Sequence, residues 1–450
     1  MRLSSKLAHF IAKTSYEDLP AEVVEFTKLC MLDWLGSAIA GAAKPSVQMI
    51  DELAKEMGGA EQATLVTGGK TSVAQAALVN GAASHVVELD DIHKSSIIHA
   101  ATVVIPVALA VAESLHKSGR ELITAIAIGY DVCFRIGEAV SPSHYYYWHN
   151  TATCGTFGAA AAVAKLLELD EGQIVDALGN AGTQAAGLWE FIVDGAMTKQ
   201  LHTGKAAMNG LLASLLAKKG FTGPAKILEG DRGFFRTMAA TYDEARITDR
   251  LGEYFKIREN SFKIHASCRH THPAIDLALQ LRKERGVRPQ DIRCIRVGGY
   301  KSVLDITNNR NPQTIYASKF SLQYCVALAF AKGRAGLTDF TEETLWDPEI
   351  RSLMERVELS LAPEIEADYP DKWGSRIEVE TEQNETLQLR TEYPKGDPEN
   401  PVSATELAEK FNELAAALRE AERKLYVETI LQLEAITDAS AIWSERSRVL

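Results

Sequence analysis

Hydrophobic positions along the first 250 residues recur with the spacing of helices that have one buried face. Between Pro20 and Leu35 an apolar side chain returns every three or four residues. Five later stretches are rich in alanine and glycine, namely residues 38–43, 76–83, 100–112, 155–167 and 204–217. Small side chains let helix axes approach closely. The pattern therefore predicts a large, tightly packed all-α body that extends to about residue 255.

The periodicity changes after residue 255. Residues 292–297 alternate apolar and polar side chains, and residues 357–361 are a second candidate strand. Residues 376–382 and 385–392 alternate around Gln383 and Asn384, which is typical of an antiparallel hairpin exposed on one face. Helical patterns at 272–285 and 317–332 separate these strands. We therefore predict an α+β domain of residues 256–399.

Helices return at the end of the chain. A linker is marked by Pro394, Gly396, Pro398 and Pro401. Ser403 and Glu406 then form a capping box, which predicts helices to about residue 436. The predicted fold class is mainly α: a large all-helical domain of residues 1–255 and 400–450, with a smaller α+β lid domain, 256–399, inserted. The cleft between the domains is where we expect a ligand.

Composition narrows the class of protein. The chain has 450 residues, of which 46% are hydrophobic and 24% charged, and this is an ordinary globular composition. Its net charge of −12 argues against a nucleic-acid or anionic-membrane surface, but not against a small anionic substrate. The cysteines form no CxxC pair, and the N-terminus does not read as a signal peptide. We therefore predict a cytoplasmic protein that acts on small molecules.

One short stretch concentrates groups that can carry protons or bind a metal. Five carboxylate or imidazole side chains fall within twelve residues: Glu88, Asp90, Asp91, His93 and His99. Apolar, alanine-rich sequence flanks them, and buried charges are costly unless they are paired or functional. An alternative is a polar loop between two core helices, in which Asp91 caps the second helix. For the whole cluster we favour a functional site.

Two further stretches in the helical part could serve the same site. Tyr145 and His149 precede a small-residue helix start, whose N–H groups could receive a carboxylate; the alternative is an aromatic plug around a buried histidine. Lys199 and His202 lie three residues apart, hence on one helix face. A lysine there can bind a carboxylate or carry a proton, and the alternative is a solvated helix start.

The fourth stretch, residues 263–273, lies at the entry to the α+β domain. Arg269 is suited to bidentate recognition of a carboxylate. Three histidines and Cys268 stand close by, but no standard zinc spacing is met. The alternative is a polar hinge between the domains.

Taken in order, these segments resemble the MmgE/PrpD family. The matching motifs are Leu89-Asp90-Asp91 with His99, Trp148-His149 with residues 155–160, residues 198–207, residues 261–263 with Cys268 and residues 272–276, and residues 317–324. The resemblance implies a homodimer with a helical body and an inserted α+β lid. It implies 2-methylcitrate dehydratase, cis-aconitate decarboxylase or iminodisuccinate epimerase activity on small di- or tricarboxylates, with no required metal or cofactor.

The predicted site follows from the motifs and the resemblance together. The expected catalytic residues are Asp90, His99, Tyr145, His149 and Lys199, and the expected substrate-binding residues are Asp91, His202, Lys205, Arg269 and His270. No metal ligand is assigned. Asp90-Asp91-Ile92 stands where dehydratase-like members often have Asn-Asp-Thr, and Cys268-Arg269-His270 stands where decarboxylase-like members have Cys-His. The substrate is therefore left open.

Three functions remain as hypotheses at this point. The first is a cofactor-independent enzyme that abstracts a proton next to a carboxylate, with dehydration or hydration placed first and epimerisation or decarboxylation as its alternatives. The second is a metal-dependent hydrolase that uses Asp90, Asp91, His93 and His99. The third is a non-catalytic dimeric binding protein, which the many acid–base residues disfavour.

Overall fold

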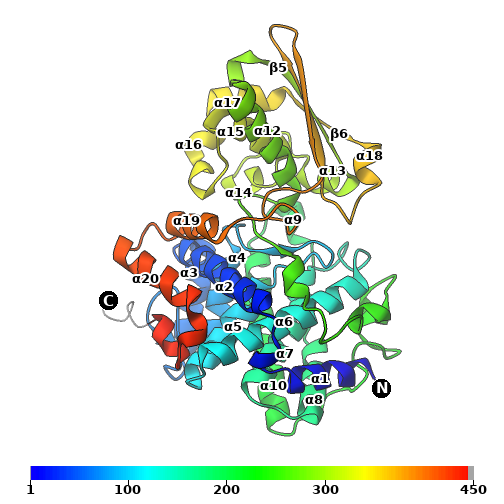
Figure 1. Ribbon diagram of the computed structural model, residues 1–450, viewed down its shortest axis with the longest axis vertical. Helices are drawn as coiled ribbons and strands as arrows, with labels where there is room; N and C mark the ends of the chain where they lie inside the picture. Colours follow the sequence, from blue (N-terminus) through cyan, green and yellow to red (C-terminus); the bar gives the residue numbers. More distant parts are fainter. Residues whose placement is uncertain (1, 444–450) are drawn as a thin grey trace. The chain divides into compact units, whose positions relative to one another are not determined.

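Helices make up most of the chain in the computed structural model, which describes residues 2–443 (Figure 1). The mainly α fold class is therefore confirmed. The chain forms two compact units, one that runs to Asn260 and resumes at Ser403, and one of Ser261–Val402. Residues 444–450, which the sequence analysis assigns to the helical domain, lie outside the described residues. The role of the second unit as a lid stays a prediction.

The first unit consists of helices joined by mostly short connections. Their bounds are α1 Leu3–Lys13, α2 Ala21–Gly41, α3 Pro45–Met57, α4 Val73–His85, α5 Ala101–Ser114, α6 Gly119–Val140, α7 Asn150–Leu166, α8 Glu171–Gly182, α9 Phe191–Asp194, α10 Thr198–Lys218, α11 Phe234–Met238, α19 Ala404–Leu414 and α20 Glu420–Leu431. The short strands β1 (Ala63–Thr64) and β2 (Lys70–Thr71) pair antiparallel, and β3 is Ile92–His93.

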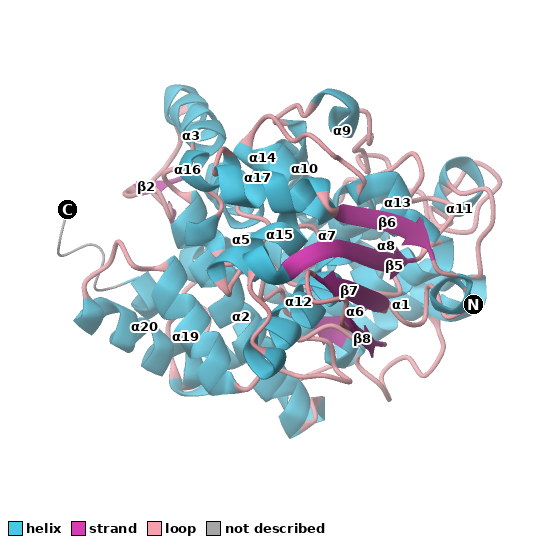
Figure 2. Ribbon diagram, turned by 90° about the horizontal axis from the view of Figure 1, so that it is seen from above, coloured by secondary structure: helices cyan, strands magenta, loops and turns pink. Residues whose placement is uncertain are grey.

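Helices α5 and α7 form the centre of this unit. Every residue from Ala101 to Glu113 in α5 is buried, and α7 contacts α5, α6, α8 and α10. A helix that is apolar on all sides has to be enclosed by other helices. The C-terminal helices α19 and α20 pack on α2, so the two ends of the chain join one core (Figure 2).

The crossing of α4 and α10 depends on two glycines. A Cβ at Gly204 would lie 2.1 Å from the carbonyl oxygen of Leu78, and a Cβ at Gly81 would lie 2.8 Å from the Cα of Gly204. The helices reach this separation because neither residue has a side chain. The Thr203 hydroxyl also donates to the Gly81 carbonyl at 3.0 Å. The crossing brings the last turn of α4 beside the first turns of α10.

The second unit is an α+β structure. Its helices are α12 His272–Arg285, α13 Lys301–Thr307, α14 Ile315–Ser318, α15 Leu322–Lys332, α16 Glu342–Leu345, α17 Pro348–Glu355 and α18 Pro363–Glu366. Its four-stranded sheet comprises β5 Ile292–Gly299, β6 Val357–Leu361, β7 Ser375–Thr381 and β8 Thr386–Thr391, in the order β6-β5-β7-β8. Strand β6 runs parallel to β5, and the other pairs are antiparallel. Strand β4 (Asn260–Ser261) spans the boundary between the units.

Apolar and charged side chains alternate along β7, so one face of the sheet is buried and the other is charged. Ile377 and Val379 are buried, and α12 packs on β7. On the opposite face Glu378 and Glu380 bond Arg296 at 2.6 Å each. The predicted strands and the predicted hairpin are therefore confirmed.

One predicted helix proves to be two. The helix expected over 317–332 is interrupted because the Ser321 side chain accepts the N–H of Tyr324 at 3.1 Å and starts α15 as a new helix. A serine in this position satisfies an N–H group that the helix itself leaves unpaired.

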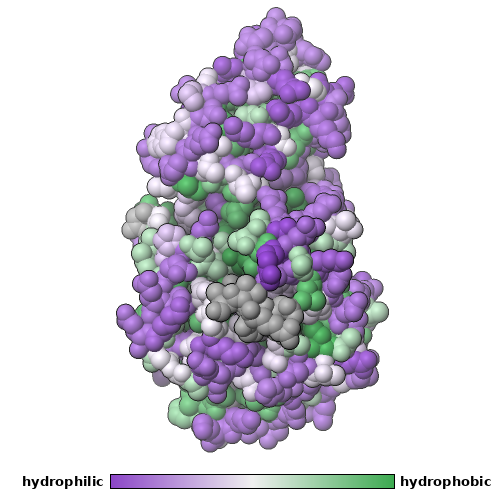
Figure 3. Space-filling view, turned by 90° about the vertical axis from the view of Figure 1, so that its left-hand side faces the viewer, coloured by the Kyte–Doolittle hydropathy of each residue, from purple (hydrophilic) through white to green (hydrophobic). Residues whose placement is uncertain are grey.

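The surface and the hydropathy of the helices fit the composition. Hydrophilic residues cover most of the face drawn in Figure 3, with hydrophobic residues in smaller groups between them. Within the described part of the chain, no helix combines the length and the apolar character that a membrane crossing requires. The cytoplasmic location remains a prediction.

Candidate functional site

The loop between α4 and α5 turns its two adjacent aspartates to different surroundings. The Asp91 carboxylate accepts hydrogen bonds from Tyr130 Oη and Asn260 Nδ2, each at 2.7 Å, and from the N–H of Ala101 at 3.2 Å. Burial raises the pKa of Asp91 to about 7. Asp91 thus bonds the first residue of α5, as the capping alternative proposed, and its predicted role in substrate binding stays a prediction.

Asp90 instead joins a cluster of buried imidazoles. Its Oδ2 lies 2.9 Å from Nδ1 of His85 and 2.9 Å from Nδ1 of His99. The His85 ring stacks on that of His149, with centroids 5.6 Å apart. His149 Nδ1 lies 3.3 Å from His202 Nδ1. Two imidazoles, those of His85 and His99, therefore contact one carboxylate, and His149, directly before α7, and His202 on α10 extend the cluster from His85.

The electrostatics of this cluster favour the neutral form of two of its imidazoles, those of His149 and His202. Burial, followed by the nearby His85, His202, Lys199 and His99, holds the pKa of His149 well below its usual range. Burial, with His85 and Lys199 as smaller causes, lowers the pKa of His202 to about 4. A neutral imidazole has a free lone pair, so these residues can accept a proton at neutral pH.

Lys199 brings a positive charge to the same region. It lies on the first turn of α10, only 3% exposed, and its Nζ is 2.5 Å from Oε1 of Glu88. Glu88 has a φ of 60°, a left-handed backbone conformation that is uncommon for residues other than glycine. A loop residue held in this way often marks a functional constraint.

An aromatic wall links Tyr145 to the cluster. The Tyr145 ring meets the edge of Trp189 at 5.0 Å between centroids, and Trp189 in turn packs against His149 at 5.2 Å. The Trp189 indole N–H donates to the Trp148 carbonyl at 2.8 Å. Segments 145–149 and 187–191 are thus held together, and Tyr145 is half-buried beside them.

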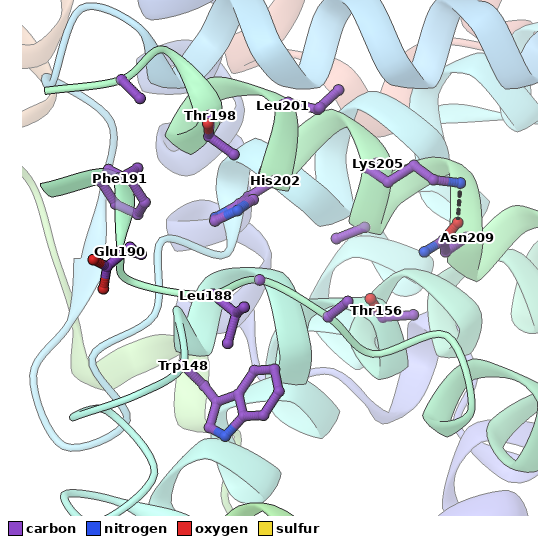
Figure 4. A pocket seen from close by; sticks show the side chains of 14 residues that line it. Trp148, Thr156, Leu188, Glu190, Phe191, Thr198, Leu201, His202, Lys205 and Asn209 are labelled. Atoms are coloured by element: carbon purple, nitrogen blue, oxygen red, sulfur yellow. Dashed lines mark hydrogen bonds between the residues drawn. The ribbon is translucent and has the colours of Figure 1, made fainter. Parts of the chain in front are cut away.

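A pocket of about 560 Å³ opens next to this cluster. His202 and Lys205 line it together with Phe191, as Figure 4 shows. Lys205 Nζ donates to Asn209 Oδ1 at 2.7 Å, and burial lowers the pKa of Lys205. The pocket has the size of a small-ligand site, with a few polar groups on a mostly apolar wall. His202 connects it to the buried His149.

The second unit holds the two remaining predicted site residues through its own contacts. Arg269 pairs with Asp397 and donates to the Lys395 carbonyl at 3.1 Å. His270 Nδ1 lies 2.6 Å from Tyr300 Oη, and burial lowers the pKa of His270 to about 3. Both side chains have partners within this unit, so their roles in substrate binding stay predictions.

The four residues proposed as metal ligands of a hydrolase have different partners and do not form one site. His93 bonds Ser96 Oγ at 2.8 Å and Glu259 at 3.3 Å, and its ring stacks on Phe134, away from Asp90 and His99. The Asp91 carboxylate accepts hydrogen bonds from Tyr130, Asn260 and the N–H of Ala101. Among the described residues, two groups have potential ligand atoms close together: His85, Asp90 and His99, and His93, Glu138 and Glu259. Neither is the set that the sequence suggested.

Two residues of the cluster were not predicted from the sequence. His85 lies outside all four motifs, yet it bonds Asp90 and stacks on His149. Glu88 was noticed only as part of a charged stretch, although it pairs with Lys199. The one feature of the sequence that could have indicated His85 is its place at the end of an apolar helix. It lies one turn beyond Gly81.

Comparison with known proteins agrees with the predicted family. The model of the MmgE/PrpD N-terminal domain matches residues 5–246, and that of the C-terminal domain matches residues 265–433. The "Cis-aconitate decarboxylase-like protein oryM" of Aspergillus oryzae is 28% identical over 98% of this chain and 96% of its own length. The cis-aconitate decarboxylase of Aspergillus terreus is 27% identical over 98% and 95%. The mitochondrial 2-methylcitrate dehydratase of Yarrowia lipolytica is 27% identical over 56% and 51%.

These matches cover nearly all of the described residues, including both units. They confirm the prediction of an MmgE/PrpD-type enzyme. The chain belongs to the MmgE/PrpD family.

Proposed function

We propose that the chain is a lyase or isomerase that abstracts a proton next to a carboxylate of a small di- or tricarboxylate, with no need for a cofactor. The observation that carries the proposal is the cluster of four imidazoles, two of which contact Asp90, with Lys199 near it. Abstraction of such a proton needs a base and a positive charge that stabilises the enolate-like transition state. The cluster has both kinds of group.

The depressed pKa of His149 fits a base that becomes stronger when substrate binds. Before binding, burial, followed by the neighbouring histidines and Lys199, holds the pKa of His149 below its usual range. A di- or trianionic substrate adds negative charge beside it, which favours the imidazolium and raises its proton affinity. His149 and His99 would thus accept or return protons, and Tyr145 would act as an acid on the aromatic side. Asp90 would orient His99.

The pocket suits the charged end of such a substrate. Lys205 and His202 are its basic side chains, and Thr156, Thr198 and Asn209 add hydrogen-bonding groups. We place one carboxylate near Lys205, with the carbon that loses its proton directed toward His202 and His149. Lys199, deeper in the protein, would stabilise the charge that develops in the transition state.

Decarboxylation is the second candidate within this proposal. The sequence analysis places dehydration or hydration first. However, the named cis-aconitate decarboxylases match over nearly the whole chain, whereas the 2-methylcitrate dehydratase of Yarrowia lipolytica matches over 56% of it. Loss of CO2 from a carboxylate also needs a stabilised carbanion and a proton donor, which the same residues would supply.

NMR in D2O with methylcitrate, cis-aconitate and iminodisuccinate would test the proposal. Dehydration replaces the signals of a hydroxyl-bearing carbon and its neighbour by alkene signals. Decarboxylation releases CO2, and epimerisation replaces a substrate proton by deuterium. We expect one of these changes with the wild-type protein, and its loss with His149→Gln. A folded wild-type protein that changes none of these acids and their close analogues would refute the proposal.

We also propose that the protein is a homodimer, as the family resemblance implies. The outer face of α10 carries Leu201, Leu212 and Leu215, which are 43%, 47% and 38% exposed. These residues lie on one stripe of the helix, at spacings of eleven and three residues. A second copy of the chain would cover such an apolar stripe.

A further inference from the structure

A single carboxylate oxygen of Asp90 contacts two histidines. Its Oδ2 lies 2.9 Å from His85 Nδ1 and 2.9 Å from His99 Nδ1, and His99 Nδ1 also lies 2.6 Å from the carbonyl oxygen of Asp91. An ionised carboxylate and a carbonyl only accept hydrogen bonds, so both imidazoles donate from Nδ1. Each ring therefore keeps the lone pair of its neutral form on Nε2.

His85 has no other hydrogen-bond partner to explain its burial. The residue is fully buried, and its Nε2 has no partner among residues 2–443. A buried acceptor without a partner lowers the stability of the folded state. A leucine of similar size would avoid this cost. What the imidazole adds is the N–H that it donates to Asp90.

We propose that His85 is a positioning residue that sets the basicity of Asp90 and, through Asp90, the proton affinity of His99. The proposal rests on the proposed function, in which His99 exchanges protons with the substrate. Two N–H donors on one carboxylate oxygen share its negative charge. If the His85 donor is lost, a larger share of this charge acts on His99, and this favours the imidazolium form of His99.

Four other titratable groups lie near His85 and His99 and also affect their protonation. They are His149 directly before α7, His202 and Lys199 on α10, and Glu88 in the loop. A substitution at His85 leaves the side chains of these four residues in place. The effect of His85 on His99 should therefore be separable from these groups by substitution at His85 alone.

Two substitutions distinguish the N–H from the rest of the side chain. His85→Leu removes the donor and keeps an apolar side chain in the space. His85→Asn keeps an N–H near the place of Nδ1 and removes the rest of the ring. We expect the acidic limb of the kcat/KM pH profile to move up by about one pH unit in His85→Leu, with turnover reduced about tenfold, and both to recover largely in His85→Asn.

His9 provides the matched control. Its Nδ1 also bonds a carboxylate, that of Glu171 at 3.0 Å, but its side chain is 58% exposed on α1. His9→Leu should leave the pH profile unchanged. An equal shift in His9→Leu, or an Asn variant that behaves like His85→Leu, would overturn the proposal.

A second readout does not depend on substrate. In ¹⁵N-histidine-labelled protein, NMR reports the tautomer of His85 and the midpoint at which His99 titrates. We expect the Nδ1–H tautomer for His85, and a higher midpoint for His99 in His85→Leu than in the wild type. A proton on Nε2 of His85, or an unchanged midpoint, overturns the proposal.

The two readouts also separate this proposal from the proposed function. If the wild-type protein acts on none of the acids, the proposed function fails, whereas the His99 midpoint still tests the role of His85. Should His85→Leu not fold, His85→Gln takes its place, because its amide reaches the position of Nε2 and cannot donate to Asp90 from the position of Nδ1.

Discussion

Replacing Glu88 by glutamine should destabilise the first unit strongly, because it removes one charge of a buried ion pair. Lys199 Nζ and Glu88 Oε1 are 2.5 Å apart, and the two side chains are 4% and 2% exposed. At an effective dielectric constant of about 20, the gross attraction is about 4–7 kcal/mol. Desolvation offsets much of it in the intact pair, but loss of one partner costs about 3–5 kcal/mol. We expect this loss in the free energy of unfolding.

A double-mutant cycle would test this reasoning. Urea unfolding of the wild type, Glu88→Gln, Lys199→Met and the double variant gives the coupling energy between the two residues. The double variant should lose at least about 2 kcal/mol less than the sum of the single variants, because neither charge then remains buried without the other. Additive losses, within about 0.5 kcal/mol, would refute the assignment.

An exposed pair of the same length serves as the control. Lys301 Nζ and Asp305 Oδ2 are also 2.5 Å apart, but their side chains are 69% and 56% exposed. Asp305→Asn should cost less than about 1 kcal/mol. An equal cost at both pairs would mean that burial is not the cause. Because the pair is buried, Lys199→Ala should also lower the free energy of unfolding.

Three further outcomes are expected. His149→Gln should lower turnover about a hundredfold or more, while His116→Gln, at an exposed histidine, should leave it unchanged; equal losses at equal folded fraction would disprove the site. Burial lowers the pKa of His144 to about 4, so this residue binds more protons in the unfolded chain, and its contribution to stability should be full above about pH 6.5 and fall by about 2 kcal/mol between pH 7 and 5. Urea midpoints should show this loss shrinking in His144→Gln, and an identical loss would contradict it. Light scattering should find a dimer at micromolar concentration that Leu212→Glu with Leu215→Glu converts to a monomer, and a monomeric wild type would contradict the proposed interface.

Local patterns in the sequence were enough for the elements of the fold. The two-residue alternation in residues 376–382 predicted β7, and Ser403 with Glu406 predicted the start of α19, where the capping box is present. Such features depend on neighbours within four residues along the chain, so the sequence contains the whole interaction. The ordered motifs likewise identified the family.

Side-chain direction and long-range partners were decided only by the tertiary structure. Asp90 and Asp91 are identical neighbours, yet one bonds two histidines and the other bonds Tyr130 and the start of α5. His85 carried no signal beyond its place at the end of an apolar helix. The close crossing of α4 and α10, which two glycines permit, brings it near residues more than a hundred positions away. The sequence by itself thus determined the family and the local elements, whereas packing between distant segments decided which buried groups share a proton, because those contacts exist only after the helices have packed.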